Sequence, residues 1–115
     1  MKLLMHILKK NDKLGIDEEK LKFDDVEKKL SEEYIEVVNE IIDYRFCKNE
    51  KSLINIVRET FDLIQVCILL LWKCHKEAKN FGKDSLIQDI NIEHKDKLMN
   101  RGWIPHAGIE IEVKE

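Results

Sequence analysis

The chain has 115 residues, of which 43% are hydrophobic and 37% are charged. This predicts a single domain, residues 1–115, with an apolar core under a well-solvated surface. Four glycines and one proline favour long helices over a turn-rich β fold. The formal net charge of −3 argues against a nucleic-acid-binding module, which carries a basic patch, but a nucleotide substrate stays open because a metal ion can neutralise phosphate.

The first two predicted helices precede residue 48. The N-terminal part is expected to hold a short helix, broken near Gly15. Asp24 is a predicted helix cap, with Glu27 three positions later as its capping-box partner. The helix that follows this cap is expected over about residues 25–46.

The third predicted helix begins after the polar stretch "KNEKS" (48–52). Asn49 or Ser52 is its expected N-cap. It runs to about Asn80, because Gly82 supplies a left-handed stop.

The C-terminal part predicts one more helix and a tail. Ser85 and Gln88 have capping-box spacing and open a helix that ends near Arg101. The tail "GIEIEVKE" (108–115) alternates apolar and acidic residues, which is typical of a short strand. The expected fold is therefore all-α, a small four-helix-type bundle with a short extended C-terminal tail.

Targeting and redox signals favour a cytoplasmic protein. The start "MKLLMHIL" lacks the full apolar region and the cleavage site of a signal peptide. The apolar run "LIQVCILLLW" (63–72) is too short to span a bilayer. The three cysteines are odd in number and show no C-x-x-C spacing, so neither a disulfide framework nor a structural zinc site is expected.

Two carboxylates stand at the start of the most apolar helix. Glu59, Asp62, Val66, Leu69 and Lys73 form one stripe at helical spacing. The middle of this stripe is apolar and should face protein. The two carboxylates therefore lie on the side of the helix that forms part of the core one turn later.

A second acidic pair lies on the preceding helix. Leu30 and Val37 mark the buried face of that helix, with Glu33 and Glu40 on its edge and Glu36 further round. If the two helices face each other, both pairs converge on one point. Clustered carboxylates repel and raise each other's pKa, and a divalent cation removes this conflict. Oxygen ligands suit Mg²⁺ or Mn²⁺.

The chain contains 23 acidic residues, so a single such pair on a solvated helix is expected by chance. The order and spacing of the two pairs are more specific. "EEYIE" (32–36), a gap of 22 residues (37–58) and "ETFD" (59–62) follow the pattern E-E-x-x-E, then E-x-x-D. This resembles the MazG-like, all-α nucleoside triphosphate pyrophosphohydrolases over about residues 25–80. The stretch "HKDKLMNRGW" (94–103) is similar to the end of small phage and bacterial members.

The resemblance implies hydrolysis of a nucleoside or deoxynucleoside triphosphate to the monophosphate and pyrophosphate, with Mg²⁺ or Mn²⁺. It implies that Glu32 orients or deprotonates the attacking water. By motif position, four carboxylates would hold the metal: Glu33, Glu36, Glu59 and Asp62.

Two other functions stay open. One is a non-catalytic helical interaction or regulatory protein, which would show no metal-dependent activity. The other is a metal-storage or di-iron bundle, but the Glu-x-x-His motif of such bundles does not occur in this chain.

The apolar residues of the helix over about 51–80 fill an arc of roughly 200°, wider than the apolar stripe of an ordinary surface helix. The remaining helices are too few to cover this arc, so a symmetric partner is expected. The resemblance also implies a homodimer or homotetramer. The residues of the arc are Leu53, Ile54, Ile56, Val57, Phe61, Leu63, Ile64, Cys67, Ile68, Leu70, Leu71 and Trp72.

Overall fold

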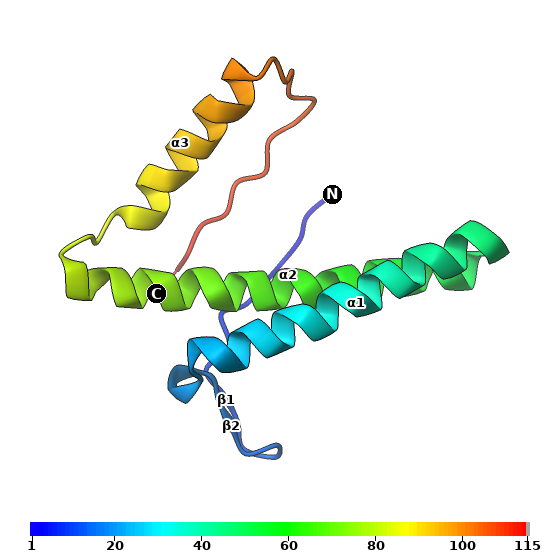
Figure 1. Ribbon diagram of the computed structural model, residues 1–115, viewed down its shortest axis with the longest axis horizontal. Coiled ribbons are helices and arrows are strands. Elements are labelled where there is room, and N and C mark those ends of the chain that lie inside the picture. The colour runs from blue at the N-terminus through cyan, green and yellow to red at the C-terminus, as the bar shows by residue number, and fades with distance from the viewer. Residues whose placement is uncertain (115) are drawn as a thin grey trace.

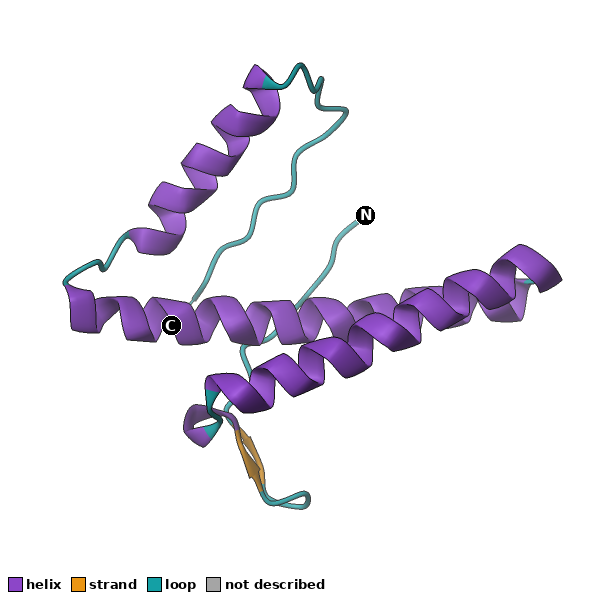
Figure 2. Ribbon diagram, viewed as in Figure 1, coloured by secondary structure: helices purple, strands orange, loops and turns teal. Residues whose placement is uncertain are grey.

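Two long antiparallel helices that lie side by side dominate the computed structural model (Figure 1). A third helix rises from the end of the second and stands away from the pair (Figures 1 and 2). The structure describes residues 1–114. Its elements in chain order are β1 (Lys10–Asn11), β2 (Ile16–Asp17), the 3₁₀ turn η1 (Glu18–Lys20), α1 (Phe23–Cys47), α2 (Glu50–Ala78), the 3₁₀ turn η2 (Lys79–Phe81) and α3 (Leu86–Asn100).

A short turn reverses the chain between α1 and α2. Lys48 adopts a left-handed conformation with φ of 42°, and its N–H donates to the carbonyl oxygen of Tyr44 at 2.8 Å. Asn49 is the N-cap of α2, as predicted, because its side-chain oxygen accepts from the N–H of Ser52 at 2.8 Å. Both helix ends are therefore satisfied within two residues, and the helices must run antiparallel.

The core lies between α1 and α2. It confirms the prediction that the apolar middle of the α2 stripe faces protein. Val66 and Leu69 of the α2 stripe are buried against Val26 of α1. Three partly buried leucines pack around them: Leu21, Leu30 and Leu70. This core is small, and it sits next to the acidic end of the stripe.

The prediction of an N-terminal helix is wrong. Strands β1 and β2 form an antiparallel hairpin in which Lys10 pairs with Asp17 and Asn11 with Ile16. The side chain of Asn11 accepts from the N–H of Leu14 at 3.1 Å. Gly15, with φ of 65°, allows the left-handed step of the turn, which a helix could not include.

The predicted cap of α1 is also wrong. α1 begins at Phe23, because the carboxylate of Asp25 accepts from the N–H of Lys22 at 2.9 Å. Asp24 therefore lies in the first turn, where its charge favours the helix dipole. Ser85 is the N-cap residue of α3, as predicted, but it forms no capping box, because its hydroxyl donates to the side chain of Asp89 at 2.8 Å and caps no backbone group.

The C-terminal part differs from the expected strand. α2 ends at Ala78 and η2 at Phe81, and Gly82, with φ of 67°, is the left-handed stop that was predicted. α3 ends at Asn100, close to the expected position. Residues 108–114 form no strand, and the sheet of the described residues consists of β1 and β2 alone. Residue 115 lies outside the described residues.

The fold is mostly helical, in agreement with the predicted class. The described residues contain three α-helices, not four, so a four-helix bundle is not formed by this part of a single chain. None of these helices is long and apolar enough to cross a membrane.

Candidate metal centre

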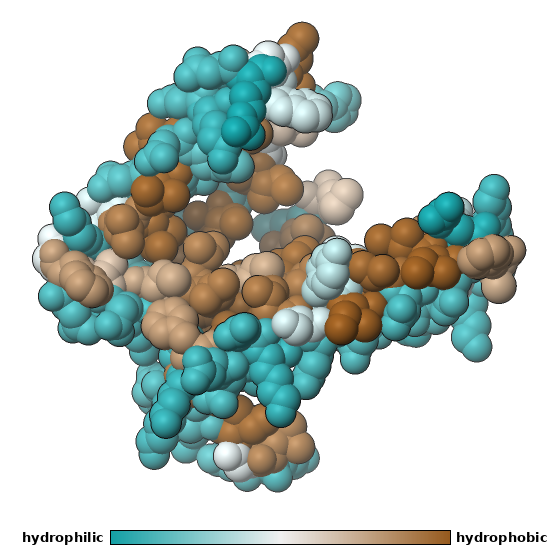
Figure 3. All heavy atoms as spheres, in the orientation of Figure 1, coloured by the Kyte–Doolittle hydropathy of each residue, from teal (hydrophilic) through white to brown (hydrophobic). Residues whose placement is uncertain are grey.

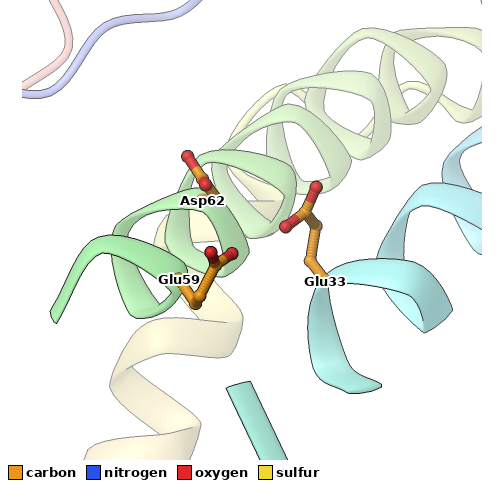
Figure 4. Close-up of side chains that lie close together, drawn as sticks. All are labelled: Glu33, Glu59 and Asp62. Atoms are coloured by element: carbon orange, nitrogen blue, oxygen red, sulfur yellow. The ribbon is translucent and has the colours of Figure 1, made fainter. Parts of the chain in front are cut away.

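Three carboxylates converge between α1 and α2. One oxygen from each of Glu33, Glu59 and Asp62 lies within 4.8 Å of the other two. Glu33 points from α1 across to α2, which contributes the other two side chains (Figure 4). These are three of the four metal ligands expected from the sequence.

Helix geometry explains the convergence. Glu33 follows the buried Val26 by seven residues, and Glu59 precedes the buried Val66 by seven residues. Seven residues are close to two turns, so each carboxylate points to the same side as its valine. Because α1 and α2 are antiparallel, both steps lead about 10.5 Å in the same direction from the core.

Glu33 sits in an unfavourable environment. Its Oε2 atom is buried and has no hydrogen-bond partner among the described residues. Burial raises the pKa of Glu33, and the nearby charges of Glu36, Asp62 and Glu59 raise it further. A buried acceptor without a donor costs stability, so this oxygen is suited to a positively charged ligand.

Glu36 links the two helices of the cluster. It is exposed, and its interaction with Glu33 and with Glu59 raises the pKa of both of these carboxyl groups. The Glu36 contact is the first cause of the raised pKa of Glu59, ahead of partial burial. Neighbouring carboxylates repel one another, and a proton or a cation between them relieves this repulsion. Glu36 therefore interacts with the cluster, but its oxygens are not among the converging ones, which belong to Glu33, Glu59 and Asp62.

Glu32 and Glu40 complete the acidic surroundings in different ways. Glu32 is exposed and is not among the converging carboxylates. Glu40 is half-buried, and its charge contributes to the raised pKa of Glu59. Glu40 is not among the ligands expected from the sequence, although its spacing of seven residues from Glu33 places both on one edge of α1.

No lysine or arginine forms an ion pair with the four carboxylates within residues 1–114. Lys73 donates to the carbonyl oxygen of Leu21, and Lys76 pairs with Glu19 at 3.6 Å. Both lysines lie on the far side of the small core. The negative charge of the cluster is therefore not compensated by an ion pair from residues 1–114.

These features fit a hard divalent cation. The donors are all carboxylate oxygens, which Mg²⁺ and Mn²⁺ prefer. One donor oxygen is buried without a partner. A cation would supply the missing positive charge, so the four residues fit the group that the sequence pattern implies.

The raised pKa values predict a stability effect in metal-free protein. A raised carboxyl pKa means that, above its ordinary value of 4.5, the native state holds the proton more tightly than the unfolded chain does. Stability contributed by Glu33 and Glu59 is therefore lost as the pH rises through their raised pKa values. Glu33→Gln removes one of these charges. In EDTA, the variant should lose less thermal stability than the wild type between about pH 5 and pH 7.

Differential scanning fluorimetry at both pH values measures this difference. Glu27→Gln is the matched control, because Glu27 is an exposed glutamate of the same helix. If the thermal stability of Glu33→Gln depended on pH as strongly as that of the wild type, this would contradict the predicted repulsion among the clustered carboxylates.

The chain matches no family model, no curated protein and no solved structure.

Proposed function

We propose that this chain is a Mg²⁺-dependent nucleoside triphosphate pyrophosphohydrolase of the MazG-like kind. It would convert an NTP or dNTP to the monophosphate and pyrophosphate. The observation that carries the proposal is the buried, unpartnered oxygen of Glu33 opposite Glu59 and Asp62. The order of the carboxylates along the sequence, E-E-x-x-E followed by E-x-x-D, supports the same function.

The carboxylates of the motif would have two tasks: four of them would hold the metal, and one would act on the attacking water. Mg²⁺ or Mn²⁺, when bound, neutralises phosphate charge and activates water for attack on the anhydride. The ligands would come from both helices: Glu33, Glu36, Glu59 and Asp62.

Glu32 is exposed and directly precedes Glu33 in the sequence. We propose that it orients the attacking water or takes its proton. Attack on phosphorus then breaks the bond between the α- and β-phosphates, and pyrophosphate leaves. No nucleophilic side chain is needed for this reaction.

Pyrophosphate release tests the proposal. The common NTPs and dNTPs are incubated with the protein and Mg²⁺ or Mn²⁺, and with EDTA as the control. We expect pyrophosphate and monophosphate in equal amounts from at least one nucleotide, and none in EDTA. Absence of release from all of them would contradict the enzymatic proposal.

A non-catalytic interaction or regulatory protein is the second candidate. It is favoured by the many large apolar side chains that the single chain leaves exposed. For such a protein, the nucleotide screen would be negative under all metal conditions.

The wider context of this function is also proposed. We place the enzyme in the cytoplasm, as a homodimer or homotetramer. The four-helix arrangement expected from the sequence would then be completed by a second copy.

A further inference from the structure

The first nine residues form an extended segment that contains no acidic side chain. They lie outside any helix or strand, and they cross α2 before they lead into β1 (Figure 1). Three of the chain's 20 lysines and arginines, and none of its 23 acidic residues, lie within residues 1–10. A protein with a net charge of −3 therefore carries one short stretch of positive charge. We call residues 1–9 the N-terminal segment.

Hydrogen bonds tether the N-terminal segment at two carbonyl oxygens. The side chain of Gln65 in α2 donates to the carbonyl oxygen of His6 at 2.8 Å, and the N–H of Glu18 donates to that of Lys9 at 2.8 Å. Met5 is half-buried, but the other five apolar side chains of the segment are at least 37% exposed. The extended conformation therefore leaves most of the apolar surface of the segment in water.

The sequence of the N-terminal segment has the pattern of an amphipathic helix. At 100° per residue, its six apolar side chains lie within one arc of about 200°. Lys2, His6 and Lys9 lie within an arc of about 60° on the opposite side. In an extended chain successive side chains alternate between two sides, and each side then carries both apolar and basic residues. The apolar residues are Met1, Leu3, Leu4, Met5, Ile7 and Leu8.

This separation of apolar and basic side chains fits an anionic membrane surface. A helix of this kind lies in the interface, with its apolar side among the acyl chains and its basic side at the headgroups. Lysines near the surface are attracted to anionic lipids. Nine residues make a helix of about 14 Å, which is too short to span a bilayer. The segment would therefore lie on the membrane.

Another apolar surface of the protein differs from the N-terminal segment in charge. Hydrophobic side chains gather along α2 on the face seen in Figure 3. With His75 neutral, α2 carries four acidic and four basic residues. Two of the acidic residues are Glu59 and Asp62 of the metal centre. α2 thus has no net charge that would attract anionic lipid, whereas apolar exposure and positive charge coincide in the N-terminal segment.

We infer that the N-terminal segment folds into an amphipathic helix on an anionic membrane surface and attaches this protein peripherally. The helix satisfies its own backbone groups where water is scarce. The hydrogen bond between Gln65 and His6 opens, and Lys9 stays beside Glu18, so that β1 and the long helices keep their structure. This inference goes beyond the proposed enzymatic function and does not depend on it.

Co-sedimentation of the full chain with large unilamellar vesicles gives the first test. The wild type should bind vesicles of phosphatidylcholine mixed with phosphatidylglycerol at least about tenfold more tightly than vesicles of phosphatidylcholine alone. The double variant Lys2→Gln and Lys9→Gln should bind the anionic vesicles about 30-fold more weakly. The matched control is Lys28→Gln with Lys51→Gln, which replaces two exposed lysines of α1 and α2. It should bind as the wild type does.

Two further variants test the apolar side and the helix. Leu4→Gln should weaken binding at least about tenfold, whereas Leu14→Gln should not, because Leu14 lies outside the segment. These leucines are 79% and 69% exposed, so both variants should fold. His6→Pro is compatible with an extended chain but breaks a helix, and it should bind at least about tenfold more weakly than His6→Gln. Equal melting temperatures without vesicles verify that the fold is kept.

The combined outcomes decide the inference. Absence of binding to anionic vesicles, or equal binding to both kinds of vesicle, would overturn it. Binding that survives the lysine and Leu4 variants would place the contact elsewhere and overturn it as well. Sensitivity to the lysines without sensitivity to Leu4 would indicate a general site for polyanions, and a His6→Pro variant that binds as well as His6→Gln would exclude the helix; each would overturn it. Preferential binding to anionic vesicles that is lost in all three variants and kept in the controls supports it.

Discussion

Glu36→Gln and Asp62→Asn are each expected to lower the rate of pyrophosphate release at least about 100-fold, since even the outer partners of metal ligands cost 10- to 100-fold. Each substitution keeps the size of the side chain and removes one negative charge. The loss should appear in kcat at saturating Mg²⁺ if the residue holds the metal during turnover. Turnover with the nucleotide found in the pyrophosphate screen is the measurement.

The controls are substitutions of the same chemistry elsewhere on α1. Glu27 and Asp43 are exposed acidic residues of that helix, so Glu27→Gln and Asp43→Asn should keep near-full activity. Circular dichroism must show equal helicity in all four variants. A Glu36→Gln or Asp62→Asn variant that remains active would remove that residue from the metal site.

The regular parts of the fold follow from periodicity in the sequence. α1 and α2 were predicted to within a few residues because apolar positions recur every three or four residues over many turns. The burial of Val66 and Leu69 follows from the same pattern. Repeated spacing over a long helix is a strong signal, because each turn adds independent evidence for the same face.

The irregular parts did not follow from the sequence. The N-terminal hairpin depends on a turn that Asn11 and Gly15 stabilise, and such local hydrogen bonds leave little trace in hydrophobic pattern. The tail alternates like a strand, but alternation produces a strand only when an edge is available for pairing. The cap of α1 depends on which of two adjacent aspartates reaches back to the N–H of Lys22.

The candidate site was predictable for a geometric reason. The spacing of Glu59 and Asp62 places both on one face of α2, but it does not say what lies opposite. The short turn at Lys48 and Asn49 fixes the antiparallel pairing, and this pairing brings Glu33 to the same point. Spacing places Glu40 on the same edge of α1 as Glu33, but it does not give the distance between the helices, which decides whether the charge of Glu40 reaches Glu59.

Mg²⁺ is expected to raise the melting temperature of the wild-type protein. A cation that binds only the native state stabilises it by mass action, by about 2.7 kcal/mol when its free concentration is 100 times Kd. Here it also relieves repulsion among carboxylates that the protein leaves without positive partners. Thermal unfolding in millimolar Mg²⁺, with NaCl of equal ionic strength as the control, measures the shift.

Asp62→Asn separates specific binding from general screening of charge. Asp62 contributes one of the converging oxygens, so the variant should lose most of the shift caused by Mg²⁺ and keep any shift caused by NaCl. Asp43→Asn, at an exposed position of α1, should respond to Mg²⁺ as the wild type does, because Asp43 is not among the converging carboxylates. An unchanged melting temperature in millimolar Mg²⁺, both with and without a non-hydrolysable nucleotide, would mean that the four carboxylates hold no metal. The buried oxygen of Glu33 would then be satisfied by a proton, which its raised pKa already favours.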